Sequence, residues 1–190
     1  MSNFSFETLD IEGAFIVNSF LSEDNRGCFV KSYEKDVFKS HGVKFNCSES
    51  FISISEKYVI RGLHFQLYRP QVKLVGVLSG KVFDVIVDLR KDSKTYGNWR
   101  GYYLSSENRT SLIIPRGCAH GFMSLSDNSM VSYQCDGLYD KNTDTGIIYN
   151  DPDIGIEWPI NDLSRAILGA RDKTLMSFCE FEKNYKFVYE

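Results

Sequence analysis

KLVGVLSGKVFDVIVDL, residues 73–89, is the stretch that decides the fold. Ser79-Gly80 interrupts it with a turn pair, and the residues on both sides are mostly β-branched or aliphatic. Beyond the turn, alternate positions share a face. One face is apolar throughout and consists of Phe83, Val85, Val87 and Leu89. The other face has carboxylates at alternate positions, Asp84 and Asp88, and this period of two predicts β-strands.

The same period of two recurs along the rest of the chain, with turn residues between the segments. We expect further strands at residues 51–54, 99–104, 111–114, 121–124 and 130–135. This many short strands predicts an all-β barrel or sandwich. A short helix is expected at residues 34–41, because Val37, Phe38 and His41 fall on one side of it, and His41 is interpreted as structural. From Leu163 onward we expect a short helix mixed with loop.

Composition limits the class of protein. A chain of 190 residues with 43% hydrophobic residues is long enough for one well-cored domain and short for two. Its net charge of −3, with both signs interspersed, gives no reason to expect a nucleic acid or a membrane as partner. The five cysteines contain no CxxC pair, which favours reduced thiols and a cytoplasmic location. The N-terminus lacks the pattern of a signal peptide, and no apolar run reaches membrane-spanning length.

Chemistry-bearing residues gather around two of the three histidines. RGLHFQ, residues 61–66, contains Arg61, His64 and Gln66, and it is followed by Lys73. The run PRGCAH then ends at His120. A cation, an imidazole, an amide and an ammonium so close in the chain predict a site for an anionic substrate that exchanges protons. For either histidine alone, a structural role with backbone partners remains the alternative.

Metal and nucleophilic chemistry fit these residues less well. His64 has no second histidine or carboxylate two positions on, so we expect no metal. Cys118 precedes His120 by two positions, and we expect their side chains to lie on opposite or offset sides, with no oxyanion motif beside them. Proton abstraction next to a carbonyl fits better. It needs a base, a cation beside the oxygen that gains charge, and a second proton carrier, which His64, Lys73 and a tyrosine can supply.

Several segments of the sequence together resemble a known protein family. The matching segments, in order, are RGLHFQ (61–66), KLV (73–75), GKVFDVIVDLR (80–90), LSSEN (104–108), IPRGCAHGF (114–122), YNDP (149–152), IGIEWP (154–159) and ARD (170–172). Together with Arg26-Gly27 they are similar in order and spacing to the dTDP-4-dehydrorhamnose 3,5-epimerase family. The Pro115-x-Gly117-x-x-His120 pattern also resembles the second cupin motif, whereas the His-x-His of metal cupins is missing.

The resemblance implies a cupin-like β-barrel, or jelly roll, with a few short helices mainly toward the C-terminus. It implies one epimerase domain over residues 1–190, in which residues 1 to about 50 hold a dimer arm and a base-binding strand and 173–190 form a tail. It further implies a homodimer, no metal and no cofactor. The substrates would be nucleotide-diphosphate 4-keto-6-deoxy sugars, in deoxysugar supply for surface polysaccharide such as the O-antigen of lipopolysaccharide.

Four residues would carry the reaction according to the resemblance. His64 is the base, and Asp172 binds its other ring nitrogen and fixes the tautomer. Lys73 stabilises the enolate oxygen, and Tyr133 returns a proton from the opposite side of the sugar. From the residues alone, Asp172 reads as a surface carboxylate, Lys73 as a solvated strand residue and Tyr133 as a packed aromatic.

Ten further positions would bind the substrate. Arg61, His120 and Arg171 would line the sugar and diphosphate region, because guanidinium groups match phosphate oxygens. The arm residues Arg26 and Phe29 would hold the nucleotide base in the partner's pocket. The remaining binding positions are Gln66, Lys31, Glu49, Phe51 and Asp144.

The sequence departs from the family pattern at positions that would contact the nucleotide base. Lys31 stands where a glutamate is usual, and Glu49 and Phe51 replace a glutamine and an asparagine. Thymine presents an N3–H donor, whereas cytosine presents acceptors that an ammonium can satisfy. Lys31 therefore favours a cytidine over a thymidine nucleotide, unless it turns away and Glu49 accepts the thymine proton.

Three other functions stay open. A single-carbon C3 or C5 epimerase of a CDP-4-keto-(3,6-di)deoxy sugar would use the same four residues. A cupin ketoisomerase is disfavoured by the sequence around Tyr133. A non-catalytic barrel that binds nucleotide sugars or carbohydrate would need Arg61 but would have no use for a His64–Asp172 pair.

Overall fold

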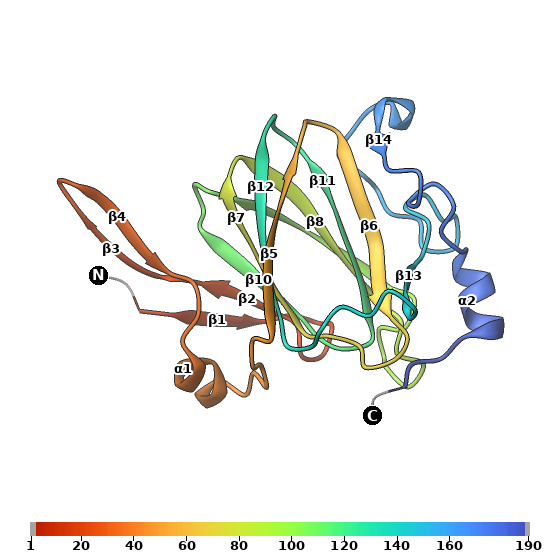
Figure 1. Cartoon of the computed structure of the whole chain (residues 1–190), viewed down its shortest axis with the longest axis horizontal. Coiled ribbons are helices and arrows are strands. Elements are labelled where there is room, and N and C mark those ends of the chain that lie inside the picture. The colour runs from red at the N-terminus through yellow and green to blue at the C-terminus, as the bar shows by residue number, and fades with distance from the viewer. Residues whose placement is uncertain (1–2, 189–190) are drawn as a thin grey trace.

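The computed structural model describes residues 3–188 as two β-sheets that face each other (Figure 1). The first sheet has the order β1 (Ser5–Thr8), β2 (Phe15–Asn18), β10 (Thr110–Ile114), β7 (Lys73–Ser79), β12 (Ser129–Cys135), β5 (Glu49–Ser55). The second has the order β13 (Asp144–Gly146), β6 (Val59–Gln66), β11 (Cys118–Ser124), β8 (Lys81–Asp88), β9 (Trp99–Ser105), and β14 (Ile167–Leu168) runs parallel to β6. The expected all-β jelly roll is confirmed.

The stretch 73–89 crosses between the two sheets. β7 lies in the first sheet and β8 in the second, and Gly80 makes the turn with a positive φ of 78°. A side chain at Gly80 would meet the Ser126 and Ser129 hydroxyls at less than 3 Å, so only glycine fits there. The turn at Ser79-Gly80 therefore separates the two layers of the barrel.

Both faces of β8 are buried, and each belongs to a different core. Val82 and Ile86 point between the sheets, where they pack with residues of β7, β11 and β12. Phe83, Val85 and Val87 lie on the outer face and contribute to a second core. Asp84, on the inner face, is fully buried inside the barrel.

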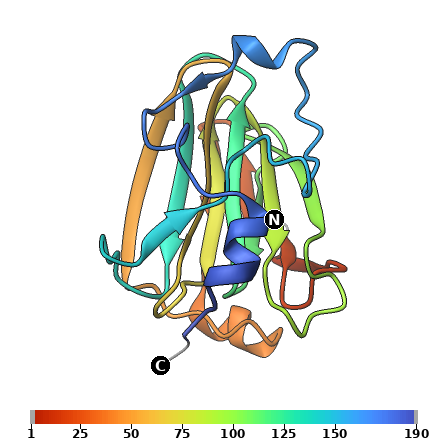
Figure 2. The same ribbon diagram turned by 90° about the vertical axis from the view of Figure 1, so that its right-hand side faces the viewer.

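The second core exists because the C-terminal segment covers the outer face of the second sheet. Phe178 and Phe181 of α2 (Phe178–Asn184) are buried against β6 and β8 residues. Figure 2 shows α2 in front of this sheet. The segment also includes the 3₁₀ turn η1 (Leu163–Arg165), and Val188 bridges to Tyr68. The described part of the tail thus packs on its own barrel.

The N-terminal residues have two different positions. β1 and β2 join the first sheet beside β10 of the same chain. The hairpin of β3 (Phe20–Asp24) and β4 (Gly27–Lys31) forms a separate two-stranded ribbon that extends away from the barrel (Figure 1). In α1 (Lys35–Ser40), Phe38 is fully buried, and the following His41 stacks on Phe6 with ring centroids 4.2 Å apart. His41 therefore has the structural surroundings predicted for it.

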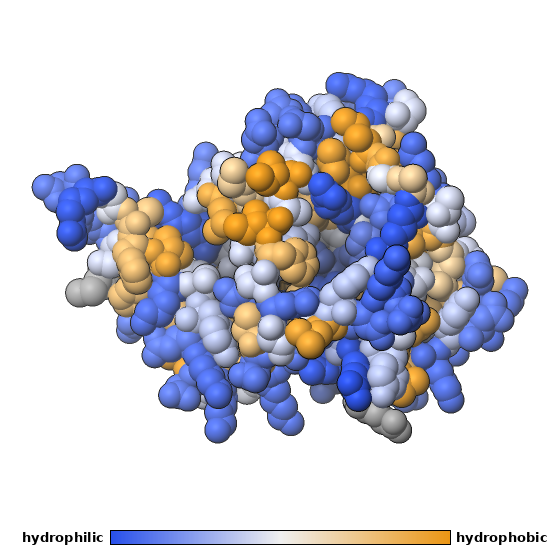
Figure 3. All heavy atoms as spheres, in the orientation of Figure 1, coloured by the Kyte–Doolittle hydropathy of each residue, from blue (hydrophilic) through white to orange (hydrophobic). Residues whose placement is uncertain are grey.

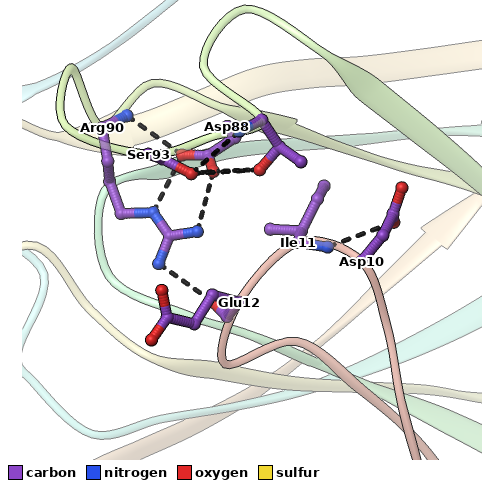
Figure 4. A network of polar contacts seen from close by, with 7 residues as sticks. Asp10, Ile11, Glu12, Asp88, Arg90 and Ser93 are labelled. Atoms are coloured by element: carbon purple, nitrogen blue, oxygen red, sulfur yellow. Dashed lines mark hydrogen bonds and ion pairs between the residues drawn. The ribbon is translucent and has the colours of Figure 1, made fainter.

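A buried carboxylate ties two loops together beside the barrel (Figure 4). Asp88 is fully buried and accepts hydrogen bonds from Arg90, Ser93 and Thr95. Arg90 also donates to the backbone oxygen of Glu12, in the turn between β1 and β2. Burial raises the pKa of Asp88, but the hydrogen bonds from Arg90, Ser93 and Thr95 outweigh it, so the pKa lies below its ordinary value.

Candidate active site

A cavity of about 410 Å³ opens between the sheets and collects most of the predicted site residues. Eleven of the fourteen line it: His64, Asp172, Tyr133, Lys73, Arg61, His120, Gln66, Glu49, Phe51, Asp144 and Arg171. They come from β5, β6, β7, β11, β12, β13 and the loop before α2. Strands and one loop that are distant in sequence therefore line one cavity.

His64 and Asp172 form a direct pair. The Nε2 atom of His64 lies 2.7 Å from Oδ1 of Asp172, and the Asp172 residue is 7% exposed. A carboxylate only accepts, so Nε2 carries the proton and Nδ1 is left as the basic nitrogen of the neutral ring. The pair has the form of a general base with an orienting carboxylate.

His120 stands opposite His64 on the neighbouring strand. β6 and β11 pair in antiparallel register with these two residues as partners. The strands approach so closely here that a side chain on Gly62 would lie 2.6 Å from the backbone of Gly121. His120 Nε2 lies 3.0 Å from both carboxylate oxygens of the fully buried Asp84. A second imidazole–carboxylate pair thus forms one wall of the cavity.

Lys73 begins β7 with its side chain in the cavity. Its Nζ donates a long hydrogen bond of 3.4 Å to the backbone oxygen of His64. Burial lowers the pKa of the ammonium from its ordinary value, although the negative groups around it oppose this effect. An ammonium in such a place can stabilise a negatively charged oxygen of a bound substrate.

Tyr133 is buried in β12 and lies between two rings. Phe51 stacks on it with ring centroids 4.7 Å apart, and His120 meets it edge-on at 5.8 Å. Burial, reinforced by the charge of Asp84, raises the pKa of the phenol well above its ordinary value. Tyr133 therefore keeps its proton at neutral pH and can act as a proton donor.

Two arginines supply positive charge to the cavity. Arg61 donates from Nε to the Ser55 hydroxyl at 3.0 Å and from Nη2 to the backbone oxygen of Ile54 at 3.2 Å. Arg171 forms an ion pair with Asp144, with 2.7 Å between Nη1 and Oδ2. Both guanidinium groups lie where they can contact an anionic substrate.

The carboxylate of Glu49 is fixed at another part of the cavity. It accepts a hydrogen bond of 3.1 Å from the backbone N–H of Tyr139 and one of 3.2 Å from the Gln71 amide. Gln66 receives the backbone N–H of Asp140 at 2.8 Å. Glu49 is thereby held as an acceptor beside the exposed ring of Tyr139.

Three predicted residues lie outside the cavity of this chain. Arg26, Phe29 and Lys31 belong to the β3–β4 hairpin, and none of them lines the cavity. Arg26 pairs with Asp24 in solvent, and Lys31 pairs with Glu34 at 2.8 Å. The ring of Phe29 is 60% exposed.

Sequence reasoning did not assign four polar residues that line or support the cavity. Gln71, Ser53 and Tyr139 line the cavity, and Asp84 holds His120. Asp84 alone had a usable signal, because a carboxylate inside an apolar strand needs a buried partner. Gln71 and Ser53 are of residue types that are common in strands and turns, and nothing in the sequence distinguished them.

One expectation about Cys118 is wrong. Cys118 lies on the same inner face of β11 as His120, because alternate residues of a strand share a face. Its thiol packs among apolar side chains, and burial strongly raises its pKa. Such a thiol is a poor nucleophile at neutral pH.

Across residues 3–188, no group of three or more His, Cys, Asp or Glu side chains is arranged to hold a metal ion. Within the same residues no helix is long and apolar enough to cross a membrane. The cavity instead brings together a base, a neutral proton donor and a cation. A site of this kind in a two-sheet barrel defines the class of cupin-type isomerases.

The comparison with known proteins narrows this class. The family model for dTDP-4-dehydrorhamnose 3,5-epimerase matches residues 8–180. The dTDP-4-dehydrorhamnose 3,5-epimerase of Methanothermobacter thermautotrophicus is 43% identical over 173 residues, which cover 91% of this chain and 94% of the relative. The chain therefore belongs to the dTDP-4-dehydrorhamnose 3,5-epimerase family, a family of isomerases.

Two crystal structures agree with this assignment. A dTDP-6-deoxy-D-glucose-3,5-epimerase from Legionella pneumophila, in complex with dTDP-4-keto-L-rhamnose, has a TM-score of 0.92 at 32% identity, covering 98% of this chain and 99% of the other. A dTDP-4-dehydrorhamnose 3,5-epimerase from Bacillus anthracis, with TDP and pyrophosphate bound, has a TM-score of 0.88 at 38% identity, covering 92% and 99%.

Proposed function

We propose that this protein inverts carbons next to the C4 ketone of a nucleotide-diphosphate 4-keto-6-deoxy sugar, as a dTDP-4-dehydrorhamnose 3,5-epimerase. The single observation that carries the proposal is the shared cavity of the His64–Asp172 pair, the Tyr133 phenol and the Lys73 ammonium. The three supply a base, a proton donor and a positive charge, which are the groups that an epimerisation needs. Family membership supports the substrate class.

The first step removes a proton from the carbon beside the ketone. Nδ1 of His64 takes the proton, the C–H electrons form a C=C bond, and the carbonyl electrons move to oxygen as an enolate. Asp172 stabilises the imidazolium that results. Lys73 stabilises the enolate oxygen as a positive charge in a partly buried site.

The second step returns a proton to the other face of the same carbon. Tyr133 donates its phenolic proton, the C=C electrons form the new C–H bond, and the carbonyl is restored. Its raised pKa ensures that the proton is present at neutral pH. The same sequence at the second carbon would give the doubly inverted product.

Arg61 and Arg171 are proposed to bind the diphosphate, with His120 beside the sugar. On binding, phosphate oxygens would compete with Asp144 for Arg171. Gln66 and Glu49 would help to position the nucleotide. The chemistry requires no cofactor, since the carbon is neither oxidised nor reduced.

A thymidine nucleotide fits the part of the cavity around Glu49 better than a cytidine nucleotide does. The Glu49 carboxylate is held in place by Tyr139 and Gln71, and it can accept the N3–H of thymine. The Lys31 ammonium, which would favour cytosine, is paired with Glu34. The CDP-linked single-carbon reaction is the second candidate, and Lys31 is the observation that favours it.

A homodimer would bring the hairpin residues to a cavity. Apolar side chains are exposed on the outer face of the first sheet at Ile52, Ile54 and Leu78, and on the hairpin at Phe29 and Val30 (Figure 3). Within the described chain β5 ends its sheet and has one unpaired edge. Such apolar surface is typical of an interface.

We place the enzyme in the cytoplasm as one domain that serves surface polysaccharide synthesis. All five cysteines are unpaired, which agrees with a reducing compartment.

The test is product analysis by proton NMR with dTDP- and CDP-linked 4-keto-6-deoxyglucose and with the CDP-linked 3,6-dideoxy ketone. The account predicts inversion at two carbons of the dTDP sugar, and stronger competition by dTDP than by CDP. Inversion at one carbon of a CDP sugar would establish the second candidate. Binding without conversion of any substrate would favour the non-catalytic barrel.

A further inference from the structure

We propose that Ser53 is a positioning residue for proton return, which donates its hydroxyl hydrogen to the Tyr133 oxygen as that oxygen becomes a phenolate. The inference rests on the proposed function and adds a residue to its second step. It follows from the position of Ser53 on β5, its burial and the absence of any other hydrogen-bond partner for it.

Strand pairing places Ser53 next to Tyr133 inside the barrel. β5 and β12 are antiparallel, with Ser53 opposite Val131 and Phe51 opposite Tyr133. Ser53 and Tyr133 are therefore diagonal neighbours on one face, a distance that a tyrosine ring can span. Both line the cavity.

The Ser53 hydroxyl differs from the other serine hydroxyls of β5 and of the barrel interior. Its Oγ is buried and has no hydrogen bond of normal geometry among residues 3–188. Ser50 donates to a backbone oxygen, Ser55 accepts from Arg61, and Ser124 and Ser129 bond to each other. Burying an unbonded hydroxyl is unfavourable, so such a group calls for a functional explanation.

Proton return turns the neutral Tyr133 oxygen beside Ser53 into a charged acceptor. When the phenolic O–H bond of Tyr133 breaks and the new C–H bond forms, a negative charge is left on a buried oxygen. Burial and Asp84 both oppose that charge, whereas the Ser53 hydroxyl and Arg61 are the groups that favour it. Arg61 is itself held by Ser55, two positions along the same face of β5. Alternate residues of this strand thus support the phenolate, directly through Ser53 and indirectly through Ser55.

The test compares Ser53→Ala with two other variants in heavy water. Deuterium is counted by mass spectrometry in recovered substrate and in product, and inversion is followed by proton NMR. Ser132→Ala is the matched control, because Ser132 is adjacent to Tyr133 in sequence but lines the outer groove of the sheet instead of this cavity. Ser53→Thr keeps the hydroxyl and suits a strand.

Loss of a hydrogen bond to a charged oxygen predicts that Ser53→Ala slows inversion by about 10- to 100-fold. Proton removal by His64 should persist in Ser53→Ala. For each molecule of product formed, the recovered, uninverted substrate should therefore contain more deuterium with this variant than with the wild type. Ser53→Thr should restore inversion, and Ser132→Ala should leave it unchanged.

An unchanged inversion rate in Ser53→Ala would overturn the inference. An equal fall of exchange and inversion in Ser53→Ala would also overturn it, because a merely structural role would produce that result. The inference would fail as well if Ser53→Thr retained exchange but did not restore inversion. If the wild type itself neither exchanges nor inverts, the proposed function fails, and that outcome is distinct from the others.

Discussion

His64 and Asp172 are 108 residues apart in the chain and 2.7 Å apart in space. His64 lies on β6, whereas Asp172 lies in the loop that leads to α2. That loop is anchored by a bridge between Ile147 and Met176, and by the buried Asp151, which accepts the backbone N–H of Phe178. The base is therefore complete only when the C-terminal segment has packed on the second sheet.

Asp172→Asn should lower kcat by about 10- to 100-fold, because an amide cannot stabilise the imidazolium or enforce the tautomer of His64. Nucleotide affinity should change little. Steady-state kinetics together with dTDP binding by calorimetry would check both parts. Asp153→Asn, at an exposed carboxylate, is the control. Wild-type kcat in Asp172→Asn would refute the assigned role of Asp172.

Deprotonation of Lys73 should produce the alkaline limb of the pH profile of kcat/KM. Burial lowers its pKa, so its charge is present at low pH and is lost at a lower pH than in a free lysine. The quantity kcat/KM should fall as that charge is lost, since it reports groups of the free enzyme. Lys73→Arg should move the limb to higher pH, because guanidinium stays protonated.

Lys73→Met should lose activity across the pH range, and Lys94→Arg, at an exposed lysine, should leave the profile as it is. An alkaline limb at the same pH in Lys73→Arg and in the wild type would assign it to another group.

Asp88→Asn should destabilise the fold by about 3–5 kcal/mol at pH 7, because it removes the buried carboxylate that forms an ion pair with Arg90. The folded-state pKa of Asp88 is below the ordinary value of 3.8, so its contribution is present above about pH 4 and is lost as pH falls through the folded value. The free energies of unfolding of variant and wild type, measured with urea, should therefore differ less at pH 3 than at pH 7. Asp92→Asn, an exposed change in the same loop, should be near neutral at both values.

A mixing experiment tests the proposed homodimer, in which the hairpin of one subunit serves the cavity of the other. Arg26→Ala and His64→Asn should each be nearly inactive as pure homodimers. After subunit exchange, a mixed dimer would contain one intact site, so equal mixing should recover about a quarter of wild-type activity. Mixing His64→Asn with Asp172→Asn, two changes in one cavity, is the control and should recover none. Absence of recovery in the first mixture would argue that Arg26 acts elsewhere.

The sequence predicted the strands well where their pattern was local. The turn at Ser79-Gly80, the alternation in β8 and the segments of β5, β10 and β12 were recognisable from spacing alone. The bounds of β1, β2 and β6 were not assigned, because β1 and β2 are only four residues long and β6 has polar residues and a glycine between its apolar positions. The burial of Phe83, Val85 and Val87 by α2 also could not be predicted, since it depends on contacts distant in sequence.

The candidate site followed from the sequence mainly through the family resemblance. His64 and Lys73 stood out by residue type, but Asp172 and Tyr133 had ordinary structural interpretations until the fold placed them in one cavity. Ser53 and Gln71 had no signal, because serine and glutamine are common at strand positions and loops. Their roles depend on which face of a strand they occupy and on what lies opposite.

The most direct measurement counts deuterons incorporated from heavy water into dTDP-4-keto-6-deoxyglucose by the wild type and by His64→Asn. The account predicts two deuterons in the product of the wild type. It predicts none with His64→Asn, which should still bind dTDP. Undiminished exchange in His64→Asn would contradict the assignment of the base, and an absence of exchange in the wild type would contradict the proposed epimerase.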